Sequence, residues 1–202
     1  MLGTKFKWLL VAACMGVMGQ GLFAQAQEIS DRFLKKADDV VAVVKNKTLS
    51  ADERNDKIIE VIEPLFDFRL MAKLSLGKKG WRSLSEAKRE EFTKLYVKRM
   101  KTSYSKKIDA YTDEKIVVRK SVKAKKNRVT LVTDLVGPKD KTEVVYKYYH
   151  PKKKIANKDE WLIYDAVISG VSIIKTDKSQ FKEVLREQSI DDLMNKMRNT
   201  EK

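Results

Sequence analysis

Late in the chain, residues 161–168 alternate so that both faces of an extended strand are mostly apolar. One face carries Trp161, Ile163 and Val167, and the other carries Leu162, Tyr164, Ala166 and Ile168. A strand of this kind needs cover on both faces, so we expect it at the centre of a sheet. Gly170 ends the run at a bulge or a sharp bend, and a helix is expected to begin near Ser179.

Earlier in the chain, apolar residues recur at three- and four-residue steps, which predicts four helices. The first covers residues 30–45, and a capping box of Ser50 and Glu53 opens the second. Asp67 suits the N-cap of the third, which ends near Gly77 and is more apolar than its length requires. That third helix either packs in the core or lines a hydrophobic cavity. The fourth, residues 84–110, is amphipathic, is opened by a capping box of Ser83 and Glu86, and is expected to lie on the sheet.

From Lys115 onward the apolar period changes to two, and strand patterns follow one another with short polar turns between them. The predicted sheet is therefore an antiparallel meander of about four strands. Two more helices are expected, over residues 179–187 and 190–197. We therefore expect an α+β fold in which N-terminal and C-terminal helices cover the sheet, with residues 27–202 as a single domain.

Residues 1–26 are expected to be a cleaved secretory signal peptide. Lys5 and Lys7 are the only charges there, a mostly apolar run continues to Phe23, and residues 24–26 form a small-x-small cleavage site. An alternative is lipoprotein processing at Cys14, although the apolar run continues well beyond that residue.

Charge narrows the possible partners. The formal net charge is +15, and removal of Lys5 and Lys7 with the signal peptide, which holds no acidic residue, leaves +13. Such an excess favours anionic partners, either lipid headgroups or acidic proteins, and no nucleic acid is expected for an exported protein. Cleavage would also remove the sole cysteine, so the fold must be held by its core rather than by disulfides.

The sequence carries no pattern typical of a catalytic or metal site. The sole histidine, His150, has no partner motif, and no metal-ligand spacing or glycine-rich phosphate loop is present. We therefore predict no catalytic residue, no metal and no cofactor. Two other functions stay open: an enzyme acting on a small hydrophobic substrate through Asp165 or Tyr164, and a lipid-free periplasmic adaptor or chaperone.

Two stretches carry a resemblance to a known family. The first is Phe-Asp-Phe-Arg-Leu-Met-Ala at residues 66–72, followed by Leu76-Gly77 and Trp81. The second runs from Trp161 through Tyr164-Asp165, Gly170-Val171-Ser172 and Gln180-Phe181 to Ile190-Asp191-Asp192-Leu193. Together they resemble the MlaC family, the toluene-tolerance or Mla-type periplasmic phospholipid-binding proteins.

The resemblance implies a monomeric periplasmic carrier of glycerophospholipid, with a hydrophobic cavity between sheet and helices. Its implied partners are an outer-membrane lipoprotein complex and an inner-membrane ABC transporter that contains an MCE-domain protein. Such a carrier, an auxiliary component of the transporter, supports outer-membrane lipid asymmetry. No residue is singled out as a headgroup reader, so weak headgroup discrimination is expected.

Two groups of site residues are predicted. The side chains expected to line the lipid pocket are Phe68, Met71, Leu74, Trp81, Leu95, Tyr96, Met100, Tyr104, Leu131, Val144, Tyr146 and Ile163. The lysines expected to steer docking to acidic partner surfaces are Lys123, Lys125, Lys126, Lys152, Lys153 and Lys154.

Overall fold

The computed structural model describes residues 17–109, 114–125, 127–138 and 140–199, with side chains described from residue 26 onward except at 104–109 and 121–125. Within these ranges, no helix offers an apolar stretch that could span a membrane. The predicted signal peptide and Cys14 lie largely outside the described residues, and helix α1 (Val17–Lys45) continues through position 26. Cleavage after Ala26 therefore stays a prediction.

Local capping explains where the next two α-helices begin. Helix α2 (Ala51–Ile62) starts with the predicted capping box, in which the Ser50 hydroxyl accepts from the Glu53 N–H and the Glu53 carboxylate accepts from the Ser50 N–H. After the short 3₁₀ helix η1 (Glu63–Leu65), Asp67 caps α3 (Phe68–Ser83) by accepting from the Leu70 N–H at 2.8 Å. Gly77, with φ of 82°, kinks α3 where its end was expected.

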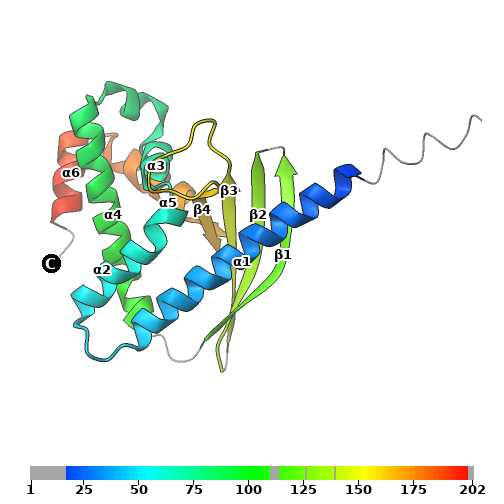
Figure 1. Ribbon diagram of the computed structural model, residues 1–202. Helices are drawn as coiled ribbons and strands as arrows, with labels where there is room; N and C mark the ends of the chain where they lie inside the picture. Colours follow the sequence, from blue (N-terminus) through cyan, green and yellow to red (C-terminus); the bar gives the residue numbers. More distant parts are fainter. Residues whose placement is uncertain (1–16, 110–113, 126, 139, 200–202) are drawn as a thin grey trace, which may run out of the picture.

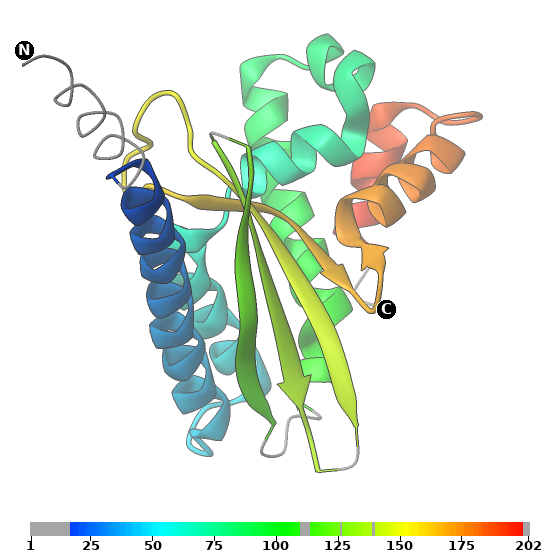
Figure 2. The ribbon, with the colours of Figure 1, turned by 90° about the vertical axis from the view of Figure 1, so that its right-hand side faces the viewer.

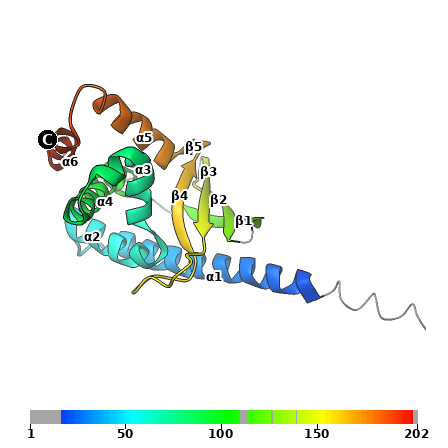
Figure 3. The same cartoon turned by 90° about the horizontal axis from the view of Figure 1, so that it is seen from above.

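The long helix α4 (Glu86–Asp109) differs from the prediction in its start and its packing. The hydroxyl of Ser85, not Ser83, accepts from the Lys88 N–H at 3.3 Å, while the Ser83 hydroxyl donates to the Gly80 carbonyl. The predicted Ser83–Glu86 capping box is therefore wrong. The expectation that this helix lies on the sheet is also wrong, because α4 packs mainly on α3, α6 and α2. Figure 3 shows α4 among these helices, apart from the strands.

The sheet confirms the predicted fold class and meander. Its strands are β1 (Lys115–Lys125), β2 (Arg128–Val136), β3 (Lys141–Tyr149), β4 (Leu162–Ile168) and the two-residue β5 (Val171–Ser172). They lie side by side in chain order, and each neighbouring pair is antiparallel.

The middle position belongs to β3, so the expectation that residues 161–168 form the central strand is wrong. Strand β4 is nevertheless buried along both faces, because α3 and α5 pack against it. At its start, Phe66 runs beside it, and Ile163 accepts a hydrogen bond from the Asp67 N–H at 3.0 Å.

A tight turn links β4 to the C-terminal helices. Ser169 and Gly170 both have positive φ, 48° and 82°, and return the chain into β5. Helix α5 (Ile173–Val184) then begins at once, not near Ser179 as predicted, because the Ser172 hydroxyl accepts from the Lys175 N–H at 3.2 Å. The chain ends with α6 (Ile190–Arg198).

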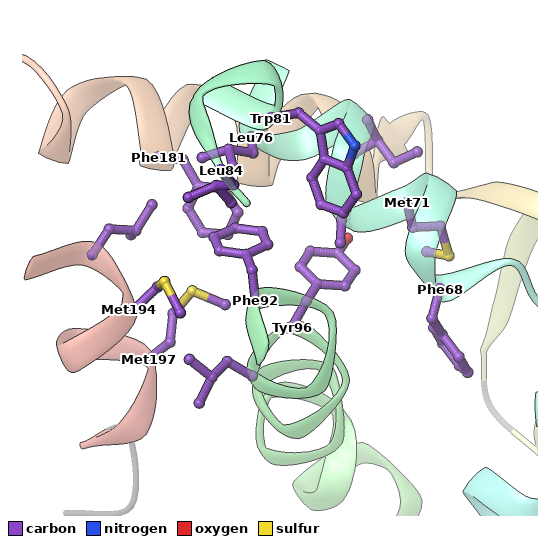
Figure 4. Close-up of a cluster of buried hydrophobic side chains, with 14 residues drawn as sticks. Phe68, Met71, Leu76, Trp81, Leu84, Phe92, Tyr96, Phe181, Met194 and Met197 are labelled. Atoms are coloured by element: carbon purple, nitrogen blue, oxygen red, sulfur yellow. The ribbon is translucent and has the colours of Figure 1, made fainter. Parts of the chain in front are cut away.

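The side chains gather in two cores. The helical core joins α3, α4, α5 and α6, and Figure 4 shows its rings and methionines pointing toward one another. Its buried members are Phe68, Met71, Ala72, Leu76, Trp81, Leu84, Phe92, Leu95, Tyr96, Ile174, Phe181, Leu193, Met194 and Met197.

The sheet core joins α1 and η1 to one face of the sheet. Its buried members are Ile29, Phe33, Leu65, Val129, Leu131, Tyr148, Trp161 and Ile163. Helix α1 lies next to β1, at one edge of the sheet. The helical core lies at the opposite edge, where α3 and α5 pack against β4 (Figures 1 and 2).

Candidate functional site

A cavity of about 250 Å³ lies between the sheet and helices α2 and α4. From the sheet it is lined by Val144, Tyr146, Ala166 and Ile168. From the helices and their connections it is lined by Asn55, Ile58, Ile59, Ile62, Phe66, Phe68, Met100, Lys101 and Ile173. The lining is almost wholly apolar, as is usual for a site that binds an apolar ligand.

The sheet wall of the cavity follows from strand register. Tyr146 pairs with Ala166 and Val144 pairs with Ile168, so these four side chains sit together on one face. The ring of Tyr146 is 4.6 Å from the ring of Phe33, centroid to centroid, which joins this wall to the sheet core. Burial raises the pKa of the Tyr146 hydroxyl to about 12, so it stays neutral.

A groove of about 860 Å³ adjoins the cavity, and Ile59 and Phe68 belong to the walls of both. It runs between η1, α3, α4 and the loop that joins β3 to β4. Five cationic side chains line it, Arg69, Lys73, Arg89, Lys94 and Lys158, against the two carboxylates of Glu63 and Asp67. The groove is therefore a cationic opening beside an apolar cavity.

Both groove carboxylates already have partners. Glu63 pairs with the Lys158 ammonium at 3.2 Å, and Asp67 accepts from the Tyr149 hydroxyl. Burial, and then the neighbouring Asp67, raise the pKa of Tyr149, so its hydroxyl remains a donor.

Lys73 and Lys94 of the groove, by contrast, are exposed and form no ion pair with a described residue. Their positive charges are available to an anion.

Two arginines of the groove are held in place around Trp81. The guanidinium carbons of Arg69 and Arg89 lie 5.5 Å and 5.9 Å from the centroid of its ring. Arg89 also donates to the Trp81 carbonyl at 3.0 Å, and Glu86 pairs with both arginines. The Arg69 guanidinium lowers the pKa of the Glu86 carboxyl, with a smaller contribution from Arg89.

A further hollow of about 450 Å³ adjoins the cavity elsewhere, sharing Met100, Ile168 and Ile173 with it. The buried carboxylate in its wall is paired, because Asp177 accepts from the Tyr96 hydroxyl at 2.8 Å and from Arg99 at 3.1 Å. The apolar cavity therefore adjoins one hollow with free cations and another whose buried charge is paired.

Comparison with known proteins identifies the family. The sequence matches the family model described as MlaC protein over residues 34–199. The chain belongs to the MlaC family. No match was found among curated proteins.

This MlaC-family chain also matches a solved structure from Ralstonia solanacearum, described as a phospholipid-binding protein in complex with a phospholipid. The TM-score is 0.70 at 15% sequence identity, and the match covers 84% of this chain and 94% of that one. At such low identity, the likeness shows a shared fold.

The predicted pocket residues of this MlaC chain fall into several groups. On the cavity wall are Phe68, Met100, Val144 and Tyr146. In the helical core are Met71, Trp81, Leu95 and Tyr96, and in the sheet core are Leu131 and Ile163. Leu74 is an exposed residue of α3, and the side chain of Tyr104 lies outside the described residues. Contact of any of them with lipid stays a prediction.

The predicted docking lysines also divide. Lys152, Lys153 and Lys154 are exposed on the loop between β3 and β4, close in sequence to Ile155 and Lys158 of the groove wall. The side chains of Lys123 and Lys125, and all of Lys126, lie outside the described residues. The loop lysines at 152–154 therefore add positive charge beside the groove.

Asp165, the acid considered for an enzymatic role, is fully engaged with its own chain. Its carboxylate accepts from the Ser172 hydroxyl at 2.8 Å, the Ile174 N–H at 3.3 Å and the Lys147 ammonium at 2.9 Å. These bonds secure the start of α5 on β4.

Nowhere in the described ranges do three or more His, Cys, Asp or Glu side chains gather as a metal site would require.

Sequence reasoning missed the contribution of α2 to the cavity. Asn55, Ile58, Ile59 and Ile62 share one face of that helix at three- and four-residue steps. The signal was present: a polar residue, Asn55, continues an otherwise apolar stripe. It was also missed that Ala166 lies on the cavity wall, where a small side chain leaves space.

Proposed function

We propose that this chain is a periplasmic carrier that binds a diacyl glycerophospholipid. The observation that carries the proposal is the shared wall of Ile59 and Phe68 between an almost wholly apolar cavity and a cationic groove. An amphiphile placed there has its acyl chains in the cavity and its phosphate among the groove cations, near Lys73 and Lys94. Membership of the MlaC family, and a neighbour of the same fold in complex with phospholipid, support the proposal.

The energetic need for such a carrier is large. Two acyl chains contain roughly 30 methylenes, and each costs about 0.8 kcal/mol when exposed to water. The cavity of about 250 Å³ is smaller than a typical ligand pocket of about 300–1,000 Å³. The lipid is therefore expected to extend from the cavity into the groove, or to move the helical wall.

The finer parts of the proposal concern transport. The protein would act as a monomer, exported by its signal peptide, and pass lipid between an outer-membrane lipoprotein complex and an inner-membrane ABC transporter with an MCE-domain protein. This transport would maintain the lipid asymmetry of the outer membrane. Its support is the family membership, together with the secretory pattern of residues 1–26.

The cargo can be tested directly. Protein purified gently from a phospholipid-containing host, without detergent, should carry about one diacyl phospholipid per chain, measured by native mass spectrometry and by analysis of an organic extract. Protein that is empty, and that also takes up no lipid from phospholipid vesicles after delipidation, would rule out the carrier function.

Docking is tested through the loop lysines. Reversing Lys152, Lys153 and Lys154 to Glu should slow association with acidic partner surfaces, because opposite charges raise the association rate. The effect should be largest at low salt, where screening is weakest. The matched control reverses three other exposed lysines that are absent from the groove wall, Lys78 and Lys79 on α3 and Lys182 on α5, so both variants carry the same net charge. Equal association rates for both variants at low salt would leave the loop lysines with no specific part in docking.

A further inference from the structure

One polar side chain stands out in the cavity wall. Asn55 of α2 is only 5% exposed, and its side-chain oxygen has no hydrogen-bond partner among the described residues. Its neighbours along the same wall are apolar, Ile58 and Ile59 on α2 and Ala166 and Ile168 on β4. A buried amide in these surroundings is unfavourable unless something outside the described chain completes its hydrogen bonds.

Neither end of this amide is fixed by the protein. No described residue forms a hydrogen bond with the side chain of Asn55, so a half-turn of the amide can present either its oxygen or its NH₂ group to the cavity. Leucine would have similar size and would avoid the unfavourable burial. The amide therefore points to a ligand that carries a hydrogen-bonding group at this depth.

Position indicates which part of a ligand that is. Ile59 belongs to both the groove and the cavity, and Asn55 lies one helical turn, about 6 Å, from it along α2. In a glycerophospholipid the ester carbonyls lie a few bonds from the phosphate and at the head of the acyl chains. A phosphate in the groove thus brings the esters toward Asn55 and sends the chains into the cavity.

We propose that the Asn55 amide donates a hydrogen bond to an ester carbonyl of the bound phospholipid, so that the protein selects ester-linked over ether-linked chains. This inference rests on the proposed phospholipid-binding function. It is the glycerol ester, rather than the headgroup, that the site would recognise. An ether oxygen is a much poorer acceptor than a carbonyl, so the ether analogue would leave the amide unpaired.

The test offers delipidated protein an equimolar mixture of two vesicle lipids with identical headgroup and chain length, a diacyl phosphatidylglycerol and its dialkyl ether analogue. Native mass spectrometry then gives the ratio of the two bound species. Wild type should prefer the diester about fivefold, which corresponds to about 1 kcal/mol for one hydrogen bond. Asn55→Leu should lose the preference, and Glu60→Gln, at an exposed position of the same helix outside the cavity wall, should keep it.

A second measurement separates recognition from structure. Without lipid, Asn55→Leu should unfold at a higher urea concentration than wild type, because the unpaired amide is gone. A variant that is more stable but keeps the ester preference would show that Asn55 is merely hydrated, and would overturn the inference. Should Asn55→Leu not fold, Asn55→Ala removes the same amide, and the same loss of the ester preference is expected.

The outcomes also separate this inference from the carrier function. Wild type that binds both lipids equally overturns the role of Asn55 and leaves phospholipid binding intact. Wild type that binds neither lipid overturns both.

Discussion

The helical core and the cavity beside it are built from the same kinds of side chain, yet only one of them is filled. In the helical core, Phe92 and Tyr96 are completely buried, and both rings stand edge-on to Phe181, at 5.9 Å and 6.4 Å between centroids. Around the cavity, Val144 and Ile168 are only partly buried and face space. The core gains dispersion contacts that the cavity wall gives up, so the wall is explained by a ligand rather than by stability.

The buried polar groups of the two regions differ as well, because one has its hydrogen-bond partners and the other does not. Beside the helical core lies Asp177, only 5% exposed, which accepts from the Tyr96 hydroxyl of that core and from Arg99. The cavity wall contains Asn55, equally buried, whose side-chain oxygen accepts no hydrogen bond from the part of the chain that the structure describes. A buried polar group with all its partners fixes helices in one arrangement. A buried polar group without them marks a place where the protein alone is incomplete.

The largest expected effect comes from truncating one side chain in each region. In lipid-free protein, Phe92→Ala should lower the free energy of unfolding by about 3–5 kcal/mol, because it opens a void in packed surroundings. Val144→Ala should cost only about 1 kcal/mol, since the side chain is half-buried and already borders space. Urea denaturation measures both. Similar losses would mean that the cavity is packed as tightly as the core.

Enlarging a small side chain in each region is the opposite change, and its expected effects on stability are smaller. Ala72 is fully buried in the helical core, and Ala166 is 5% exposed on the cavity wall. Ala72→Phe should cost about 1–3 kcal/mol through overpacking. Ala166→Phe should leave the lipid-free stability nearly unchanged, because the ring enters existing space, while the amount of lipid bound falls.

Both variants are compared with wild type by urea denaturation of lipid-free protein and by lipid content after exposure to phospholipid vesicles. The distinction between the regions would be lost if Ala166→Phe were as destabilised as Ala72→Phe and still bound lipid normally.

What could be predicted from sequence depended on how local the cause was. The caps at Ser50 and Asp67 follow from residues within one turn, and both are confirmed. The early start of α5 was missed because it depends partly on Asp165, from the neighbouring strand, which accepts from the Ile174 N–H. The central placement of β4 failed for the same reason, since its cover comes from α3 and α5.

The pocket residues show the limit most clearly. Apolar periodicity predicts which side chains are buried, and it predicts burial equally for Leu131, Leu95 and Met100. It does not say what stands opposite each of them. Leu131 belongs to the sheet core, Leu95 belongs to the helical core, and Met100 packs beside the helical core but also lines the cavity. A cavity is a property of two facing surfaces, so no single stretch of sequence contains it.

The smallest expected effect lies at the rim of the helical core, where Glu86 joins the start of α4 to Arg69 of α3. The hydrogen bond from the Arg69 guanidinium lowers the pKa of Glu86 below its ordinary value of 4.5. Because the folded-state pKa is depressed, the ionised carboxylate contributes stability above the unfolded pKa and loses it as the pH falls through the folded pKa. Thermal unfolding of Glu86→Gln should therefore show a lower midpoint than wild type at pH 7, with a difference that vanishes in acid. Glu187→Gln is the control, since Glu187 is exposed and forms no ion pair with a described residue. A difference between wild type and Glu86→Gln that persisted unchanged in acid would mean that the exposed pair adds nothing, as is common for surface ion pairs, and that the substitution acts on packing instead.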